Sequence, residues 1–183
     1  MLFFPRYDKK QDAELVALVA RGDHKAFEAL LDRHQQAVYG FAFYMLRSIP
    51  DAEDVAQEVF MRLYRTADNY LPTAGLRAYL FRIARNLCID ISRKKTPLAM
   101  EMPPEPAALE TPFNQLSNAQ LGYHIRAAMD QLPERQRTAL HLRHVQEMNY
   151  KEIAQIMDTT VNAVESLMTR ARKGFKIHFD LSG

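Results

Sequence analysis

Residues 150–176 read YKEIAQIMDTTVNAVESLMTRARKGFK, and this stretch decides the fold of the C-terminal part of the chain. Its first eight residues predict a short helix with one apolar face. A tight break follows at 158–160, and Thr160 is the predicted N-cap of a longer helix. That longer helix turns Val164 and Ala171 inward. Two helices joined in this way are typical of a DNA-binding helix-turn-helix, whose second helix lies in the major groove.

The charge of the second helix supports this interpretation. Its last turns carry four basic residues with no acid between them, which suits contacts with phosphate groups. Glu165 leaves the middle of the helix poorer in positive charge, and a plain helical hairpin with a solvated basic end is the alternative. The residues that we expect to contact duplex DNA are Thr160, Asn162, Ala163, Ser166, Thr169, Arg170, Arg172 and Lys173.

Helix start signals extend the pattern toward the N-terminus. Pro133 suits the first turn of a helix over 133–146, because the amides of that turn have no partner within the helix. Asn149 and Glu152 have the spacing of a capping box at the start of the next helix. Asp158 stands in the turn where glycine is usual, and Asp tolerates the left-handed conformation better than most residues.

An acidic, proline-rich stretch divides the chain. Residues 96–116 contain five of the nine prolines and three glutamates, with no lysine or arginine. Proline removes backbone donors and disfavours helical geometry in the residue before it, so we expect a flexible extended linker here. The linker separates a first lobe, residues 10–95, from a second lobe, residues 117–178. Both lobes are predicted to be helical, which makes the fold class all-α with two small helical domains.

The first lobe contains three long helical patterns. An apolar stripe begins near Lys25 and continues through Leu30 to Met45. Pro50 and Asp51 are expected to open the second helix, with Asp51 as its N-cap. The third helix follows a break at 72–75.

The third helix of the first lobe is strongly basic. Residues 76–95 hold six basic residues against one acid, Asp90, and Tyr79 and Phe81 are interleaved with them. Cations alternating with aromatic rings suit single-stranded nucleic acid, because bases can stack while the backbone charge is neutralised. Packing of both rings in the core is an equally open alternative.

The preceding helix is acidic on one flank. Asp51, Glu53, Asp54 and Glu58 would repel DNA, and they favour a basic protein partner. A solvated face with good helix capping is the alternative interpretation.

Composition and motifs exclude several classes of protein. The chain has 183 residues, 24 basic and 22 acidic, so its net charge of +2 identifies no partner. It has no apolar run of membrane-spanning length, and a single cysteine, Cys88, excludes an internal disulfide, so we expect a cytoplasmic protein. There is no phosphate-binding glycine loop and no nucleophile elbow. His141 and His144 lack a third ligand nearby, so we expect no metal site. Because the catalytic motifs are absent, we also expect no cofactor, no small-molecule substrate and no catalytic residue.

Three strings together resemble one protein family. They are DAEDVAQEVFMRLYR at 51–65, LRAYLFRIARNLCID at 76–90, and LPERQRTALHLRHVQEMNYKEIAQIM with AVESLMTRARKGF between 132 and 175. They are similar, in order and spacing, to regions two and four of bacterial RNA polymerase sigma factors. The short N-terminal part and the direct linker between lobes resemble the extracytoplasmic-function group. The resemblance covers residues 10–178.

The resemblance implies roles for the first lobe. Its acidic helix would dock on the clamp helices of the largest subunit of core polymerase. The loop 68–75 and the helix after it would open the minus-ten element and capture a flipped base. The implied polymerase-binding residues are Asp51, Asp54, Gln57, Glu58 and Arg62, and the implied minus-ten residues are Tyr79, Arg82, Arg85, Asn86, Arg93 and Lys94.

The resemblance also implies how the rest of the chain is used. The linker would run through the polymerase interior, the second lobe would read the minus-thirty-five element, and an anti-sigma factor would hold the protein inactive. Tyr64 and Tyr79 stand where tryptophan is frequent in the family, and Glu165 stands where lysine is frequent. A stand-alone helix-turn-helix regulator is the alternative function.

Overall fold

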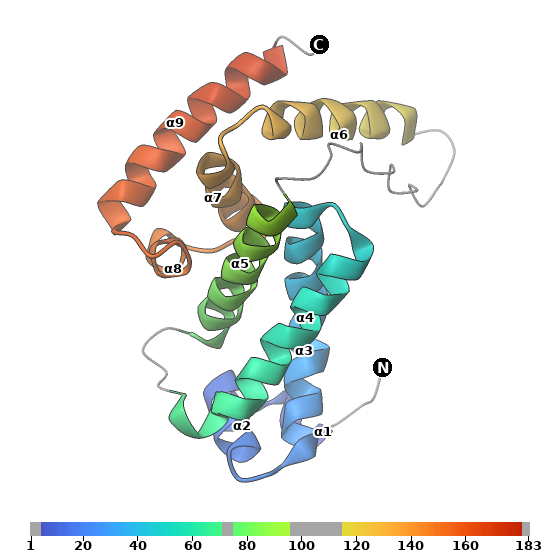
Figure 1. Ribbon diagram of the computed structural model, residues 1–183, viewed down its shortest axis with the longest axis vertical. Coiled ribbons are helices and arrows are strands. Elements are labelled where there is room, and N and C mark those ends of the chain that lie inside the picture. The colour runs from blue at the N-terminus through green and yellow to red at the C-terminus, as the bar shows by residue number, and fades with distance from the viewer. Residues whose placement is uncertain (1–4, 71–74, 96–114, 181–183) are drawn as a thin grey trace. The chain divides into compact units, whose positions relative to one another are not determined.

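The computed structural model describes residues 5–70, 75–95 and 115–180, and every regular element in these ranges is a helix. The chain forms two compact units, one built on helices α1–α5 and the other on α6–α9 (Figure 1). This confirms the prediction of an all-α chain with two small helical domains. The predicted linker lies outside the described residues except at its last two positions.

The first lobe is a bundle in which α3 is the central helix. Helix α3 packs against α2, α4 and α5, and Figure 1 shows α3, α4 and α5 running alongside one another. The rings of Phe41 and Phe81 meet at 5.2 Å, and Leu30 of α3 and Leu63 of α4 are also fully buried in the core. The elements of this lobe are α1 (Pro5–Asp8), α2 (Asp12–Val19), α3 (His24–Leu46), α4 (Ile49–Thr66), the 3-10 turn η1 (Ala67–Asn69) and α5 (Leu76–Lys95).

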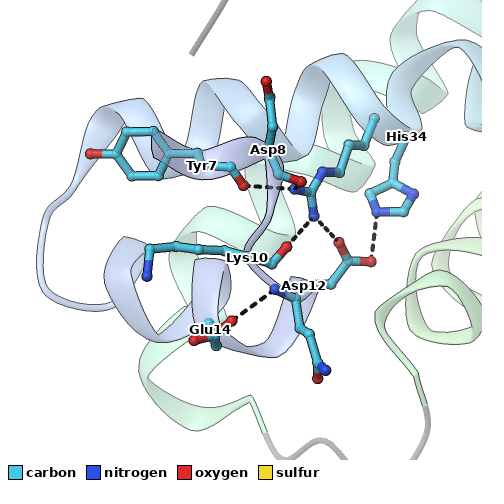
Figure 2. Close-up of polar contacts among 8 residues, drawn as sticks. Tyr7, Asp8, Lys10, Asp12, Glu14 and His34 are labelled. Atoms are coloured by element: carbon cyan, nitrogen blue, oxygen red, sulfur yellow. Dashed lines mark hydrogen bonds and ion pairs between the residues drawn. The ribbon is translucent and has the colours of Figure 1, made fainter. Parts of the chain in front are cut away.

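A polar network ties the N-terminal helices to α3. The Arg33 guanidinium donates to the backbone carbonyls of Tyr7, Asp8 and Lys10 and to the Asp12 carboxylate, at 2.8–3.0 Å. The other oxygen of Asp12 lies 2.8 Å from His34 Nε2 (Figure 2). These contacts hold the backbone at and just after the end of the short helix α1 against α3.

The start of α4 corrects one prediction. The helix begins at Ile49, with Ser48 at the N-cap position, so Asp51 is not the cap. Pro50 fits inside the first turn because its missing amide hydrogen has no intrahelical acceptor there. Asp51 lies in the same turn, where a carboxylate interacts favourably with the helix dipole.

The second lobe is held together by α9, which packs against α6 and α7. Val164, Met168 and Ala171 form the buried face of α9. A Cβ atom at Gly174 would lie 2.8 Å from a terminal methyl of Leu132, so a larger residue here would force the Leu132 side chain to shift. The elements of this lobe are α6 (Gln115–Asp130), α7 (Glu134–His144), α8 (Tyr150–Ile156) and α9 (Val161–Asp180).

Three predicted helix signals in the second lobe are confirmed. The Asn149 amide donates to Glu152 and the Glu152 amide donates to Asn149, at 2.8 and 3.0 Å, which is a reciprocal capping box. The Thr160 hydroxyl accepts from the Ala163 amide at 3.2 Å and caps α9. Asp158 has a φ of 48°, the left-handed conformation that the turn requires. None of the helices in the described ranges combines the length and the apolar composition that a bilayer span needs.

Candidate functional site

The acidic flank of α4 is accessible. Asp54 and Gln57 are exposed, whereas Asp51 and Glu58 are half-buried. Glu58 accepts a hydrogen bond from Arg62 Nε at 2.7 Å, one helical turn away, and this bond lowers the pKa of the Glu58 carboxyl. The flank therefore presents charged and polar groups, and one of its carboxylates is already paired.

An apolar groove adjoins this flank and was missed by sequence reasoning. It has a volume of about 630 Å³ and lies between α3 and α4. Of the five predicted polymerase-binding residues, only Gln57 lines it. The groove residues are Phe27, Leu31, Gln35, Gln36 and Tyr39 on α3, and Glu53, Ala56, Gln57, Phe60 and Met61 on α4.

The sequence does contain a signal for this groove. The inner face of α4 needs only Val55, Val59 and Leu63 to pack in the core, and all three are buried. Phe60 is buried beside that face, and Met61 extends the apolar arc to the surface, where its side chain is 38% exposed. An apolar arc wider than the core requires indicates a docking surface for another molecule.

The predicted minus-ten residues of α5 do not all share one environment. Arg82, Asn86, Arg93 and Lys94 are exposed, in agreement with a basic outer face. Arg85 is 8% exposed, so its predicted position on a free face is wrong. It follows Phe81 by four residues and therefore lies beside the buried stripe, with no hydrogen-bond partner for its Nε atom among the described residues.

Tyr79 is fixed in place from two sides. Its hydroxyl lies 2.9 Å from the Thr66 hydroxyl, and its ring meets the edge of Tyr70 at 5.3 Å. The ring is half-buried. Tyr79 thus links the end of α4 to the start of α5. Residues 71–74 of the predicted loop 68–75 lie outside the described residues.

The predicted duplex-binding residues all lie exposed in the second lobe. Thr160 precedes α9, and the other seven stand on that helix away from its buried face. Three of these residues also make contacts within the lobe. The Thr160 hydroxyl caps α9, Arg170 Nε donates to the Ser166 carbonyl at 3.2 Å, and Arg172 donates to the Tyr150 hydroxyl at 3.4 Å. The exposed set is Thr160, Asn162, Ala163, Ser166, Thr169, Arg170, Arg172 and Lys173.

A second apolar pocket borders α9, and the predicted duplex-binding residue Arg172 lies on its edge. It has a volume of about 340 Å³ and is lined from α6, α7 and α9 by residues that include Ile125, Val145 and Phe175. His141 and His144 also line it, His141 buried and His144 exposed. In the described ranges, no group of three potential metal ligands comes together.

Comparison with known families accounts for both lobes. Residues 30–97 match the family model of sigma-70 region 2, and residues 124–173 match the model of sigma-70 region 4. The two matches follow the order that the sequence strings predicted, and between them lies the proline-rich stretch.

Individual relatives extend the similarity over most of the chain. The RNA polymerase sigma-H factor of Pseudomonas aeruginosa is 30% identical over 90% of this chain and 92% of its own length. The extracytoplasmic-function sigma-E factor of Escherichia coli K12 is 31% identical, over 88% of this chain and 91% of its own.

Solved structures share the fold. CnrH, solved in complex with the cytosolic domain of CnrY, aligns with a TM-score of 0.72 and 25% identity, covering 94% of this chain and 99% of that one. The sigma factor RpoE of Bartonella quintana, solved with the anti-sigma factor NepR, aligns with a TM-score of 0.68 and 23% identity, over 85% of this chain and 98% of that one.

Proposed function

Because the chain belongs to the extracytoplasmic-function group of the sigma-70 family, whose members direct core RNA polymerase to promoters, we propose a separate role for each of its lobes. The observation that carries the family assignment is the pair of region matches in one chain. A stand-alone helix-turn-helix regulator would account for the second match alone, so the sigma factor function is favoured over that alternative.

The first lobe, residues 10–95, docks on core polymerase through α4. The supporting observation is that an acidic flank and an apolar groove lie side by side on α3 and α4: Glu53 belongs to both, and Gln57 lines the groove. Charged groups steer association with a basic partner, while burial of apolar side chains supplies affinity. Asp51, Asp54, Glu58 and Arg62 complete the proposed polymerase-binding set, which faces the clamp helices of the largest subunit.

The basic face of α5 follows the single strand of the minus-ten element. Arg82, Asn86, Arg93 and Lys94 are exposed and suited to backbone and base contacts. Tyr79 supports the start of this surface from its fixed position against Tyr70. Arg85 also belongs to the proposed set, but its side chain would have to leave its buried position to reach DNA.

The second lobe, residues 117–178, reads the minus-thirty-five element as duplex DNA. The support is the exposure of all eight predicted residues on and before α9. In a helix-turn-helix the N-terminal part of the second helix meets base edges, while cations at its far end meet phosphates. Asn162 and Ser166 lie in the N-terminal part of α9. Toward its far end lie Arg170, Arg172 and Lys173.

An anti-sigma factor regulates the protein in this proposal. The sigma factor RpoE of Bartonella quintana, whose fold this chain shares, was solved in complex with the anti-sigma factor NepR, and CnrH was solved in complex with the cytosolic domain of CnrY. The two apolar cavities, one in each lobe, offer surfaces for such a partner. The chain itself would act in the cytoplasm, with no cofactor, and the polymerase would carry out all bond formation.

Footprinting of promoter complexes tests the division of roles. Core polymerase with this chain should protect an upstream duplex element and make thymines near the start site reactive to permanganate, which detects unpaired bases. Core polymerase alone should do neither on the same fragment. Protection by the chain alone, with the same extent as in the complex and no reactive thymines, would contradict the proposal and favour a stand-alone regulator.

A further inference from the structure

Glu165 is an exception on the DNA-facing side of α9. Between Val161 and His178 the helix carries four lysines and arginines and only this one carboxylate. Glu165 is exposed, three residues after Asn162 and four before Thr169, so these three side chains are neighbours on the helix surface. Its place in the proposed interface is therefore that of a base-reading residue.

No role inside the protein explains this carboxylate. The N-terminal cap of α9 is made by Thr160, and the capping-box position three residues later is Ala163, so Glu165 takes no part in the cap. Its backbone carbonyl accepts from the Thr169 hydroxyl at 3.0 Å, but its carboxylate has no partner among the residues that the structure describes. It also lies beyond the first turn, where the helix dipole has little effect.

A carboxylate near DNA is repelled by phosphates, so it contributes to binding only where a base offers it a donor. In the major groove cytosine presents its N4 amino group, which Glu and Asp accept from. Guanine presents only acceptors and thymine an acceptor beside a methyl group. Adenine places the N7 acceptor next to its amino group, which disfavours a carboxylate.

We propose that Glu165 is a specificity-determining residue, which accepts a hydrogen bond from the N4 amino group of a cytosine in the upstream promoter element. The proposal rests on the assignment of α9 to the major groove under the proposed function. Glutamine at this position would instead donate to N7 and accept from N6 of adenine, so the preferred base should change at one position only.

Selection from a randomised upstream element tests this. Holoenzyme reconstituted with the wild-type chain, Glu165→Gln or Glu165→Lys is allowed to bind a fragment pool, and the bound fraction is sequenced. The wild type should prefer cytosine at one position by about 5- to 100-fold. Glu165→Gln should move that preference to adenine and Glu165→Lys to guanine, with the other positions unchanged. An unchanged base preference with uniformly tighter binding would overturn the proposal, because Glu165 would then only repel phosphates.

Two further variants separate this inference from the proposed function. Asp180→Asn removes the same charge at the far end of α9 and should leave the base preference as in the wild type. Arg170→Ala should weaken binding to all sequences alike. If Arg170→Ala weakens binding but the Glu165 variants keep the wild-type preference, only the inference about Glu165 is wrong. If none of these variants changes binding to the upstream element, the assignment of α9 to the groove is wrong as well.

Discussion

The Nε2 atom of His34 lies 2.8 Å from Oδ2 of Asp12, and the other oxygen of the same carboxylate binds Arg33 at 2.9 Å. One carboxylate thus joins the start of α2 to two adjacent residues of α3. The hydrogen bond from His34 is the largest cause that lowers the pKa of Asp12. The first lobe therefore depends on the ionised form of Asp12.

Asp12→Asn should destabilise the first lobe by about 1 to 2 kcal/mol at neutral pH, because a charge-assisted hydrogen bond is lost. The folded-state pKa of Asp12 lies below its ordinary value of 3.8, so its stabilisation is present above that value and is lost as pH falls through the lower one. The difference between wild type and variant, measured by urea unfolding and circular dichroism, should shrink in acid. A difference that stays constant down to about pH 3 would contradict this account.

Reversing the charge of α4 should abolish binding to core polymerase. The double variant Asp54→Lys with Glu58→Lys places two cations on the flank proposed to face a basic partner, while both positions are solvent-accessible, so the fold should survive. Binding is measured by co-elution with core polymerase. Asp32→Lys with Asp90→Lys makes the same charge change outside α4 and should still bind. Unimpaired binding of the α4 variant would show that the docking assignment is wrong.

Arg170→Ala should weaken binding to the upstream element for every sequence. Loss of one phosphate contact should also reduce the slope of log affinity against log salt concentration by about one. Titration of the holoenzyme on one promoter at several salt concentrations measures both quantities. A change in base preference with an unchanged salt slope would mean that Arg170 reads a base instead.

Thr160→Ala should lower the stability of the second lobe by about 1 kcal/mol, because the Ala163 amide loses its cap. In a lobe of this size that corresponds to a drop in melting temperature of about 4 to 8 °C. Thr160→Ser keeps the hydroxyl and should melt close to the wild type. Equal loss in both variants would point to the methyl group, not to the cap.

Cys88 should be inert in the folded protein. Burial raises the pKa of its thiol to about 12, so almost none of it is thiolate near neutral pH. A disulfide reagent should label it slowly in buffer and rapidly in urea. Rapid labelling of the native chain would contradict the packing of α5 around this residue.

Local signals in the sequence were sufficient for much of the second lobe. The Asn149–Glu152 capping box, the Thr160 cap and the left-handed Asp158 depend on residues close together in the chain, and all three are present as predicted. The cap of α4 was mispredicted because Asp51 and Ser48 are both good N-cap residues, and the choice between them depends on where Pro50 fits in the first turn.

Features formed by residues far apart in the chain could not be predicted in this way. Arg33 contacts the backbone of residues about two dozen positions away, and no local pattern identifies carbonyl partners. The groove beside Gln57 exists only once α3 and α4 pack together. Arg85 reads as a basic residue on a basic helix, and its burial is decided by neighbouring helices.

In vitro transcription with core RNA polymerase, with and without this chain, on a pool of genomic fragments is the most direct test of the sigma factor assignment. New start sites should appear only with the chain, and their upstream sequences should align in two elements at one spacing. If no new start site appears while the chain alone binds specific DNA, the assignment of this protein as a promoter-recognition subunit is contradicted.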